Sequence, residues 1–197
     1  VYIYFVMEEI AAITPTDQTV PIQEAHKFDT TALEAFMREN VEGFTSPLEL
    51  SQFRGGMSNP TFMVTDGGGK RYVLRKKPPG DLLPSAHAVD REFKIISAIA
   101  STGVPVSKAY ALCEDESVVG QIFYVMEFKN GRVFRGVDLP DLGAQERGEI
   151  YNNMADILAE LHEIDYAAVG LGDLGRAGGY CERQVRRWSQ QYEARKT

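Results

Sequence analysis

Cysteine and long apolar runs are scarce in this 197-residue chain, and each shortage excludes a class of protein. The two cysteines, Cys113 and Cys181, lie far apart and match no metal-binding spacing, so we expect two buried thiols rather than a disulfide framework. The opening apolar run VYIYFVM ends at Glu8; it is too short to cross a bilayer and lacks the basic start of a secretory signal. No later run reaches membrane-spanning length, so no membrane partner is expected.

Positive charge is also in short supply. The 28 Asp and Glu residues outnumber the 21 Lys and Arg residues and give a formal net charge of −7. A protein that binds nucleic acid normally carries a basic surface, so nucleic acid is not an expected partner. We expect a cytoplasmic protein whose cationic sites are confined to local pockets. The sequence also contains no Cys-x-x-Cys pair, no His-Glu-x-x-His motif and no serine-centred nucleophile elbow.

Apolar residues make up 44% of the chain, which is enough for an ordinary globular core. Periodicity and turn signals divide the chain into three parts. Residues 1–27 have no clear period and are interpreted as a loosely ordered leader, residues 28–130 mix strand and helix patterns, and residues 131–197 are mainly helical. Because the chain begins with Val and stops in a charged, helix-like run, we interpret it as a fragment or a premature stop.

The middle part predicts an α+β lobe in which a five-stranded antiparallel sheet carries one inserted helix. A capping-box pattern at Thr31 and Glu34 predicts a first helix that ends near Gly43. Alternating apolar residues predict five strands, at residues 48–53, 61–65, 71–76, 108–112 and 121–128.

Turn and helix signals complete this pattern. The DGGG sequence at residues 66–69 predicts a hairpin, and the inserted helix is predicted at residues 86–100. The last part predicts two helices, at residues 146–164 and 180–195. We expect the first of these to bury an apolar stripe made of Ile150, Met154, Ile157, Leu158, Leu161 and Ile164.

The inserted helix contains an unusual acid. At about 100° per residue, Glu92 falls inside the apolar arc of this helix. A carboxylate that faces a core is costly unless a cation meets it; the alternative is that Glu92 lies at the edge and reaches water. In the strand RYVLRKK, alternation places Arg75 on an apolar face, so Arg75 is the predicted partner. Lys76 and Lys77 are interpreted as solvated charges beside a proline turn.

The segment FRGGMSNPTFMV, residues 53–64, places two glycines, a serine and an asparagine between two strand patterns. A tight hairpin could need these residues, and so could the phosphates of a nucleotide. The segment is followed by a strand with an inward cation and then a helix with an inward acid. This order recurs where a glycine loop and an acid-positioned cation hold a nucleotide's phosphates.

Five segments together resemble the aminoglycoside phosphotransferase (choline-kinase-like) superfamily: GGMSNPTF, YVLRKKP, HAVDREFKII, FYVMEFKNGRVF and ILAELHEID. The similarity covers most of residues 48–197 and is closest to the kinase domains found in or beside acyl-CoA dehydrogenases. It implies a protein-kinase-like, nucleotide-binding N-lobe with its hinge at residues 28–130. Residues 131–197 would be the start of a helical C-lobe, which is incomplete here.

The resemblance also implies which residues bind ATP. The glycine turn would cover the phosphates, and Arg75, oriented by Glu92, would replace the phosphate-contacting lysine that is usual at this position; an arginine stays charged and binds bidentately. Val73 would pack on the adenine, Met126 would line the back of the pocket, and backbone groups near the hinge would bond the base. The implied cofactor-binding residues are Gly55, Gly56, Met57, Ser58, Asn59, Val73, Arg75, Glu92, Met126, Glu127 and Lys129.

The family reaction transfers the γ-phosphoryl group of ATP to a hydroxyl of a small molecule, with Mg²⁺ as cofactor, and an acyl compound is one candidate acceptor. The family carries a His-Gly-Asp segment, a following Asn and a later metal-binding Asp, none of which is found in this sequence. His162 is interpreted as structural and Asp173 as part of a polar surface turn. We therefore assign no catalytic or metal-binding residue and do not expect this chain alone to turn over substrate.

Two other functions stay open from the sequence. The chain could be a non-catalytic module that binds nucleotide without using it. It could also be a scaffold or interaction domain in which the same strands bind no nucleotide. Oligomeric state is not predicted.

Overall fold

The computed structural model describes residues 19–53, 59–80, 87–132, 134, 137–175 and 178–195. They belong to two compact units, which divide between Ile164 and Asp165. The first unit contains the sheet and the helices α1 (Thr30–Asn40), α2 (Val89–Ile99) and α3 (Ala144–Glu163), with a short 3-10 helix, η1 (Glu24–His26). The second unit contains α4 (Tyr180–Arg195).

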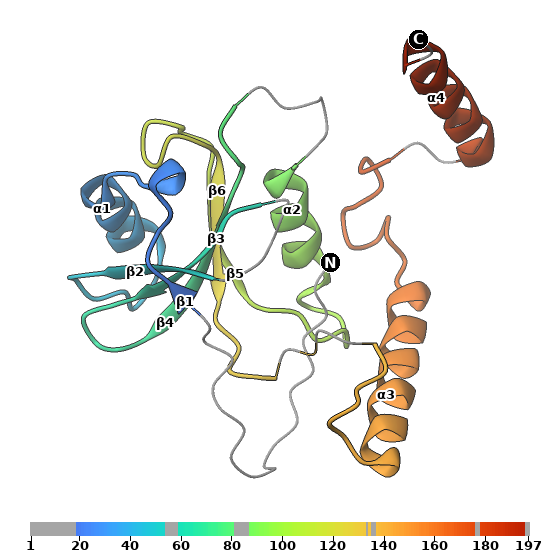
Figure 1. Cartoon of the computed structure of the whole chain (residues 1–197), viewed down its shortest axis with the longest axis horizontal. Helices are drawn as coiled ribbons and strands as arrows, with labels where there is room; N and C mark the ends of the chain where they lie inside the picture. The colour runs from blue at the N-terminus through green and yellow to red at the C-terminus, as the bar shows by residue number, and fades with distance from the viewer. Residues whose placement is uncertain are drawn as a thin grey trace. The chain divides into compact units, whose positions relative to one another are not determined.

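Within the described residues, six antiparallel strands form one sheet in the order β1-β2-β3-β4-β6-β5 (Figure 1). They are β1 (Thr19–Val20), β2 (Glu49–Phe53), β3 (Thr61–Thr65), β4 (Arg71–Lys76), β5 (Ala109–Cys113) and β6 (Phe123–Glu127). This confirms the predicted α+β, kinase-like fold class.

The prediction of five strands is wrong by one, because β1 lies in the segment interpreted as a leader. Thr19 pairs with Phe53, and Val20 pairs with Gln52, at the edge of the sheet next to β2. A two-residue strand is too short to show an alternating pattern in the sequence. Residues 1–18 lie outside the described part of the chain.

Helices α1 and α2 cover opposite faces of the sheet (Figure 1). Side chains alternate along a strand, so Tyr72 and Leu74 of β4 pack in the core cluster that contains Leu33 of α1. Val73, between them, packs in the other cluster with Val89 of α2. The alternation predicted for this strand is confirmed, and it gives the two faces separate cores.

Helix α1 starts at a different cap from the predicted one. Asp29 is the N-cap, and its carboxylate accepts a hydrogen bond of 2.8 Å from the backbone N–H of Thr31. The capping box predicted from Thr31 is therefore wrong, because that residue already lies in the first turn. Glu34 instead accepts a 3.1 Å bond from the backbone N–H of Leu48 and links α1 to the start of β2. Aspartate is a better N-cap residue than threonine, which is consistent with a helix that begins after Asp29.

Lys76 is buried, with 5% of its surface exposed, so the interpretation of this residue as a solvated charge is wrong. Its ammonium donates a 3.0 Å hydrogen bond to the carbonyl of Val119 and lies 4.6 Å from the centroid of the Phe28 ring. Burial lowers the pKa of Lys76 from its ordinary value. The alternation that turns Leu74 toward α1 applies to Lys76 as well, since β4 extends to this residue.

The apolar stripe predicted for α3 is only partly buried. Ile150 and Ile157 are buried, but Met154 and Leu158 are 45% and 47% exposed. His162, near the end of α3, is exposed, and its interpretation as a structural rather than a catalytic histidine stays a prediction.

Helix α4, described by itself, has the bounds that the sequence predicts. Its Cys181 is exposed, whereas Cys113 is buried, so the prediction of two buried thiols holds for Cys113 alone. In the part of the chain that the structure describes, no helix has the length and apolar character needed to span a membrane.

The turn between β3 and β4 is organised by the buried carboxylate of Asp66. It accepts hydrogen bonds of 2.9 Å from the backbone N–H groups of both Gly68 and Lys70. Two longer bonds come from the backbone N–H of Thr45, at 3.3 Å, and from the hydroxyl of Tyr72, at 3.4 Å. The predicted hairpin is confirmed, and one side chain supplies the acceptors that hold it.

Two of the three glycines in this turn are required by its geometry. A Cβ at Gly67 would lie 2.4 Å from the carbonyl oxygen of Ser46, so this position cannot hold a side chain without backbone movement. Gly69 has φ +82°, in the left-handed region that other residues rarely adopt.

We predict that Asp66→Ala lowers the free energy of unfolding by about 2 to 3 kcal/mol, because it removes one buried side chain that accepts four hydrogen bonds. Asp66→Asn keeps one carbonyl acceptor and should lose less. The matched control is Asp115→Ala, which removes a similar bond to the Ser117 N–H in an exposed turn. Urea unfolding followed by circular dichroism measures all three, and equal losses at Asp66 and Asp115 would contradict this role.

Candidate nucleotide-binding site

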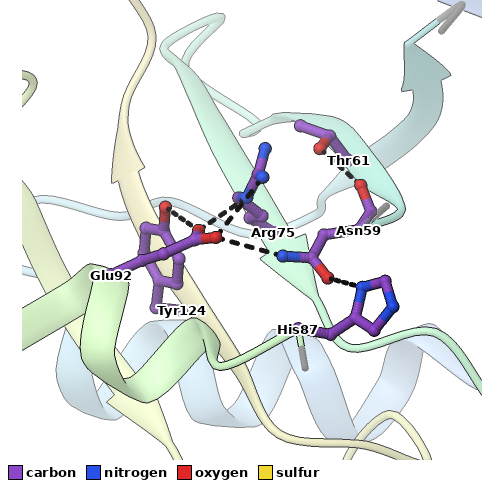
Figure 2. A network of polar contacts seen from close by, with 6 residues as sticks. All are labelled: Asn59, Thr61, Arg75, His87, Glu92 and Tyr124. Atoms are coloured by element: carbon purple, nitrogen blue, oxygen red, sulfur yellow. Dashed lines mark hydrogen bonds and ion pairs between the residues drawn. The ribbon is translucent and has the colours of Figure 1, made fainter. Parts of the chain in front are cut away.

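Three side chains from three elements meet on the sheet face covered by α2 (Figure 2). They are Arg75 of β4, Glu92 of α2 and Tyr124 of β6, and Arg75 and Tyr124 are partners across neighbouring strands. Arg75 Nε lies 2.7 Å from Glu92 Oε2, and Arg75 Nη2 lies 3.5 Å from Glu92 Oε1. The pairing of Arg75 with Glu92 that the sequence predicts is therefore present.

The ion pair is partly buried. The side chain of Arg75 is 11% exposed and that of Glu92 is 34% exposed. Glu92 thus lies at the edge of the apolar arc of α2 and is paired there, which combines the two alternatives that the sequence left open. Its position in the first turn of α2 also suits a negative charge, since the N-terminal end of a helix carries partial positive charge.

Asn59, the last residue of the predicted glycine turn, is buried and joins the same network (Figure 2). Its Nδ2 donates a 3.1 Å hydrogen bond to Glu92 Oε1, and its Oδ1 lies 3.0 Å from Nδ1 of His87. The hydroxyl of Thr61 donates to the backbone carbonyl of Asn59 at 3.1 Å. The side chain of Asn59 therefore supports Glu92 in this structure, while a direct contact of Asn59 with phosphate stays a prediction.

Sequence reasoning missed Tyr124 and His87. The buried hydroxyl of Tyr124 donates a 3.2 Å bond to Glu92 Oε2, and His87 contacts Asn59. One signal was available for Tyr124: a tyrosine in the middle of a buried strand usually has a polar partner for its hydroxyl. His87 gives no such signal, because its partner lies 28 residues away along the chain.

An apolar surface continues from the ion pair along the strands. Val73 and Met126 are both buried, and they are partners across β4 and β6. Val73 and Arg75 are two residues apart on one strand, so they point to the same face about 6.6 Å from each other. Phe53 and Phe128 pack against this cluster. The structure therefore brings Val73, predicted to pack on the adenine, and Met126, predicted to line the back of the pocket, close to Arg75.

Glu127 and Lys129 stabilise the segment that leaves β6. The carboxylate of Glu127 lies 2.7 Å from Nζ of Lys129 and accepts a 3.2 Å bond from the backbone N–H of Lys108. Burial alone would raise the pKa of Glu127, but these contacts outweigh it and lower the pKa. The backbone N–H of Glu127 already donates to the carbonyl of Lys108 at 2.8 Å, so a base would have to bond its carbonyl instead.

Four predicted phosphate-covering residues, Gly55, Gly56, Met57 and Ser58, lie outside the described residues, and their role stays a prediction. Asp173 lies in an exposed turn, as predicted. Among the described residues, no three His, Cys, Asp or Glu side chains gather in a way that could hold a metal ion.

Comparisons with known proteins find relatives of this chain. A family model described as "Phosphotransferase enzyme family" matches residues 49–197. A probable acyl-CoA dehydrogenase from Arabidopsis thaliana is 51% identical over 185 residues, which are 90% of this chain and 22% of that protein. Acyl-CoA dehydrogenase family member 11 from Mus musculus is 47% identical over 183 residues, which are 91% of this chain and 23% of that protein.

One solved structure is similar both in sequence and in fold. It is that of a protein from Ralstonia eutropha described as an aminoglycoside phosphotransferase, with 48% identity and a TM-score of 0.74. The match covers 87% of this chain and 49% of that one. The chain thus spans about half of this structural relative and under a quarter of the two curated relatives.

We predict that Tyr124→Phe lowers the free energy of unfolding by about 1 kcal/mol, because a buried hydroxyl loses its bond to Glu92. In a Glu92→Ala background the same change should have little effect, since the acceptor is already gone. Urea unfolding of the four variants measures this coupling, with the exposed Tyr166→Phe as control. An equal loss in both backgrounds would show that the Tyr124 hydroxyl does not act through Glu92.

Proposed function

Because this chain belongs to the phosphotransferase enzyme family, we propose that its α2-covered sheet face binds ATP for transfer of the γ-phosphoryl group to a small-molecule hydroxyl. The observation that carries the proposal is the ion pair between Arg75 and Glu92. It fixes a permanent positive charge in a half-buried site beside an apolar wall, and Asn59 hydrogen bonds to the same carboxylate.

The charge at Arg75 suits the phosphate end of the nucleotide. A guanidinium stays protonated, and its planar donors match phosphate oxygens. Glu92 restricts the rotamers of Arg75, so less side-chain entropy is lost when an anion binds. A cation held in this way binds a triphosphate more tightly than one that must first be ordered.

The apolar wall suits the base. Val73 and Met126 offer two neighbouring, buried apolar side chains on the face that Arg75 also occupies. A purine has two flat apolar faces and a polar edge, so this wall and the carbonyl of Glu127 provide both kinds of contact. The wall and the cation lie side by side on one face of the sheet, because Val73 and Arg75 are two residues apart on β4 and Met126 of β6 is the cross-strand partner of Val73. A nucleotide with its base at one end and phosphates at the other requires such an arrangement.

Magnesium would bind together with the phosphates and neutralise part of their charge. Among the described residues, Arg75 is the positive charge that we propose to neutralise the phosphates together with magnesium. They contain no set of metal ligands, so the ion would be bound through the nucleotide rather than by this part of the chain.

The chain spans only 22% and 23% of its two curated relatives, so the transfer step is proposed for the whole protein and nucleotide binding for this part of it. Those relatives are described as acyl-CoA dehydrogenases, enzymes that act on acyl-CoA. A hydroxylated acyl compound is therefore the acceptor that we propose, in preference to an aminoglycoside.

We predict that the 197-residue chain binds MgATP saturably and that Glu92→Gln weakens this binding about tenfold, or about 1.4 kcal/mol, because Arg75 is held less firmly and must be ordered when phosphate binds. The loss in free energy of unfolding should be smaller than that, because Gln keeps the size of Glu and one of its two acceptor oxygens. Isothermal titration calorimetry and urea unfolding measure the two effects.

The matched control is Glu24→Gln, which removes the exposed ion pair with Lys27 and should leave affinity unchanged. A Glu92→Gln variant that unfolds easily but binds MgATP normally would contradict the role of the pair. If the folded wild-type chain shows no saturable binding at millimolar MgATP, the scaffold function is correct instead.

A further inference from the structure

His87 lies two residues before the start of α2, in a backbone conformation that residues with a side chain rarely adopt. Its φ is +58°, in the left-handed region, where histidine, asparagine and aspartate are the most frequent residues after glycine. Its carbonyl accepts a 2.9 Å hydrogen bond from the backbone N–H of Val89, the first residue of the helix. The imidazole points at Asn59 (Figure 2).

The chemistry of Asn59 determines which atom of His87 carries a proton. Asn59 Nδ2 lies 3.1 Å from a carboxylate oxygen of Glu92, which only accepts, so the amide nitrogen must be on that side. The amide oxygen is then the atom that lies 3.0 Å from His87 Nδ1. Two acceptors do not form a hydrogen bond, so His87 Nδ1 must carry hydrogen and donate.

The result is a directed chain of hydrogen bonds. His87 Nδ1–H donates to Asn59 Oδ1, Asn59 Nδ2–H donates to Glu92 Oε1, and Glu92 Oε2 contacts Arg75 Nε at 2.7 Å. If the amide of Asn59 rotated by half a turn, its oxygen would face a carboxylate. The donor on His87 favours the amide orientation that stabilises Glu92.

We propose that His87 is a positioning residue for nucleotide binding: through the amide of Asn59 it holds Glu92, and therefore Arg75, in the geometry that binds phosphate. This inference rests on the proposed function. His87 itself needs no contact with the nucleotide, because its effect is transmitted by two hydrogen bonds.

His26 provides an internal contrast. Gln52 Oε1 accepts a 3.0 Å bond from the backbone N–H of Gln23, so Gln52 Nε2 is the atom that lies 2.9 Å from His26 Nδ1. Here the histidine nitrogen must accept. The two histidines are therefore expected to have opposite protonation at Nδ1 when both rings are neutral.

Nitrogen-15 NMR of the imidazoles tests the direction of the bond without any nucleotide. At a pH where both rings are neutral, we expect Nδ1 to be protonated in His87 and unprotonated in His26. An unprotonated Nδ1 in His87 would overturn the proposal, because the amide of Asn59 could not then be oriented by it.

Two variants separate the donor from the backbone conformation. His87→Gly adopts the positive φ freely but lacks the donor, and it should weaken MgATP binding about 3- to 10-fold, the range expected for one lost hydrogen bond. His87→Asn also tolerates this φ and places an amide N–H where Nδ1 lay, so it should restore affinity to within about twofold. The control is His162→Asn, a change at an exposed position of α3.

Calorimetric titration with MgATP distinguishes this inference from the proposed function. If wild type does not bind MgATP, the proposed function fails and the positioning role fails with it. If wild type binds and His87→Gly binds equally well, the inference alone is overturned. A Gly variant that is weakened, together with an Asn variant that is restored, supports it.

Discussion

The carboxylate of Glu92 is the contact on which the site depends. It receives donors from Arg75 on β4, Tyr124 on β6 and Asn59 at the end of the glycine segment. A half-buried charge is stable only when its partners are in place, so these segments must adopt one arrangement for the carboxylate to be satisfied. The same contact therefore links α2 to the sheet and sets the position of the positive charge proposed to bind phosphate.

Side chains alternate along the strands, so the two faces of the sheet carry different sets of residues. The face under α1 is filled by large apolar and aromatic side chains, and the ammonium group of Lys76 is buried there against Phe28. The face under α2 combines the apolar pair Val73 and Met126 with the polar network around Glu92. The larger apolar core lies on the first face, and the proposed nucleotide site lies on the second.

Local patterns predicted the features that depend on neighbouring residues. The bounds of β3, β4 and α4, the hairpin at Asp66 and the inward direction of Arg75 all follow from alternation, helical period or turn chemistry. Features with long-range causes were missed. The partner of His87 is 28 residues away, β1 is too short to show a period, and the burial of Lys76 requires the carbonyl of Val119 and the ring of Phe28.

The central claim is that Arg75, held by Glu92, binds the phosphate end of a nucleotide while the wall of Val73 and Met126 binds its base. The most direct test compares the affinities of MgATP and adenosine for wild type and Arg75→Met by calorimetry. The account predicts that MgATP binding weakens by at least about tenfold, as expected for a lost charge-assisted bond, while adenosine binding changes by less than about twofold. Equal weakening of both ligands, or no weakening of MgATP, would contradict it.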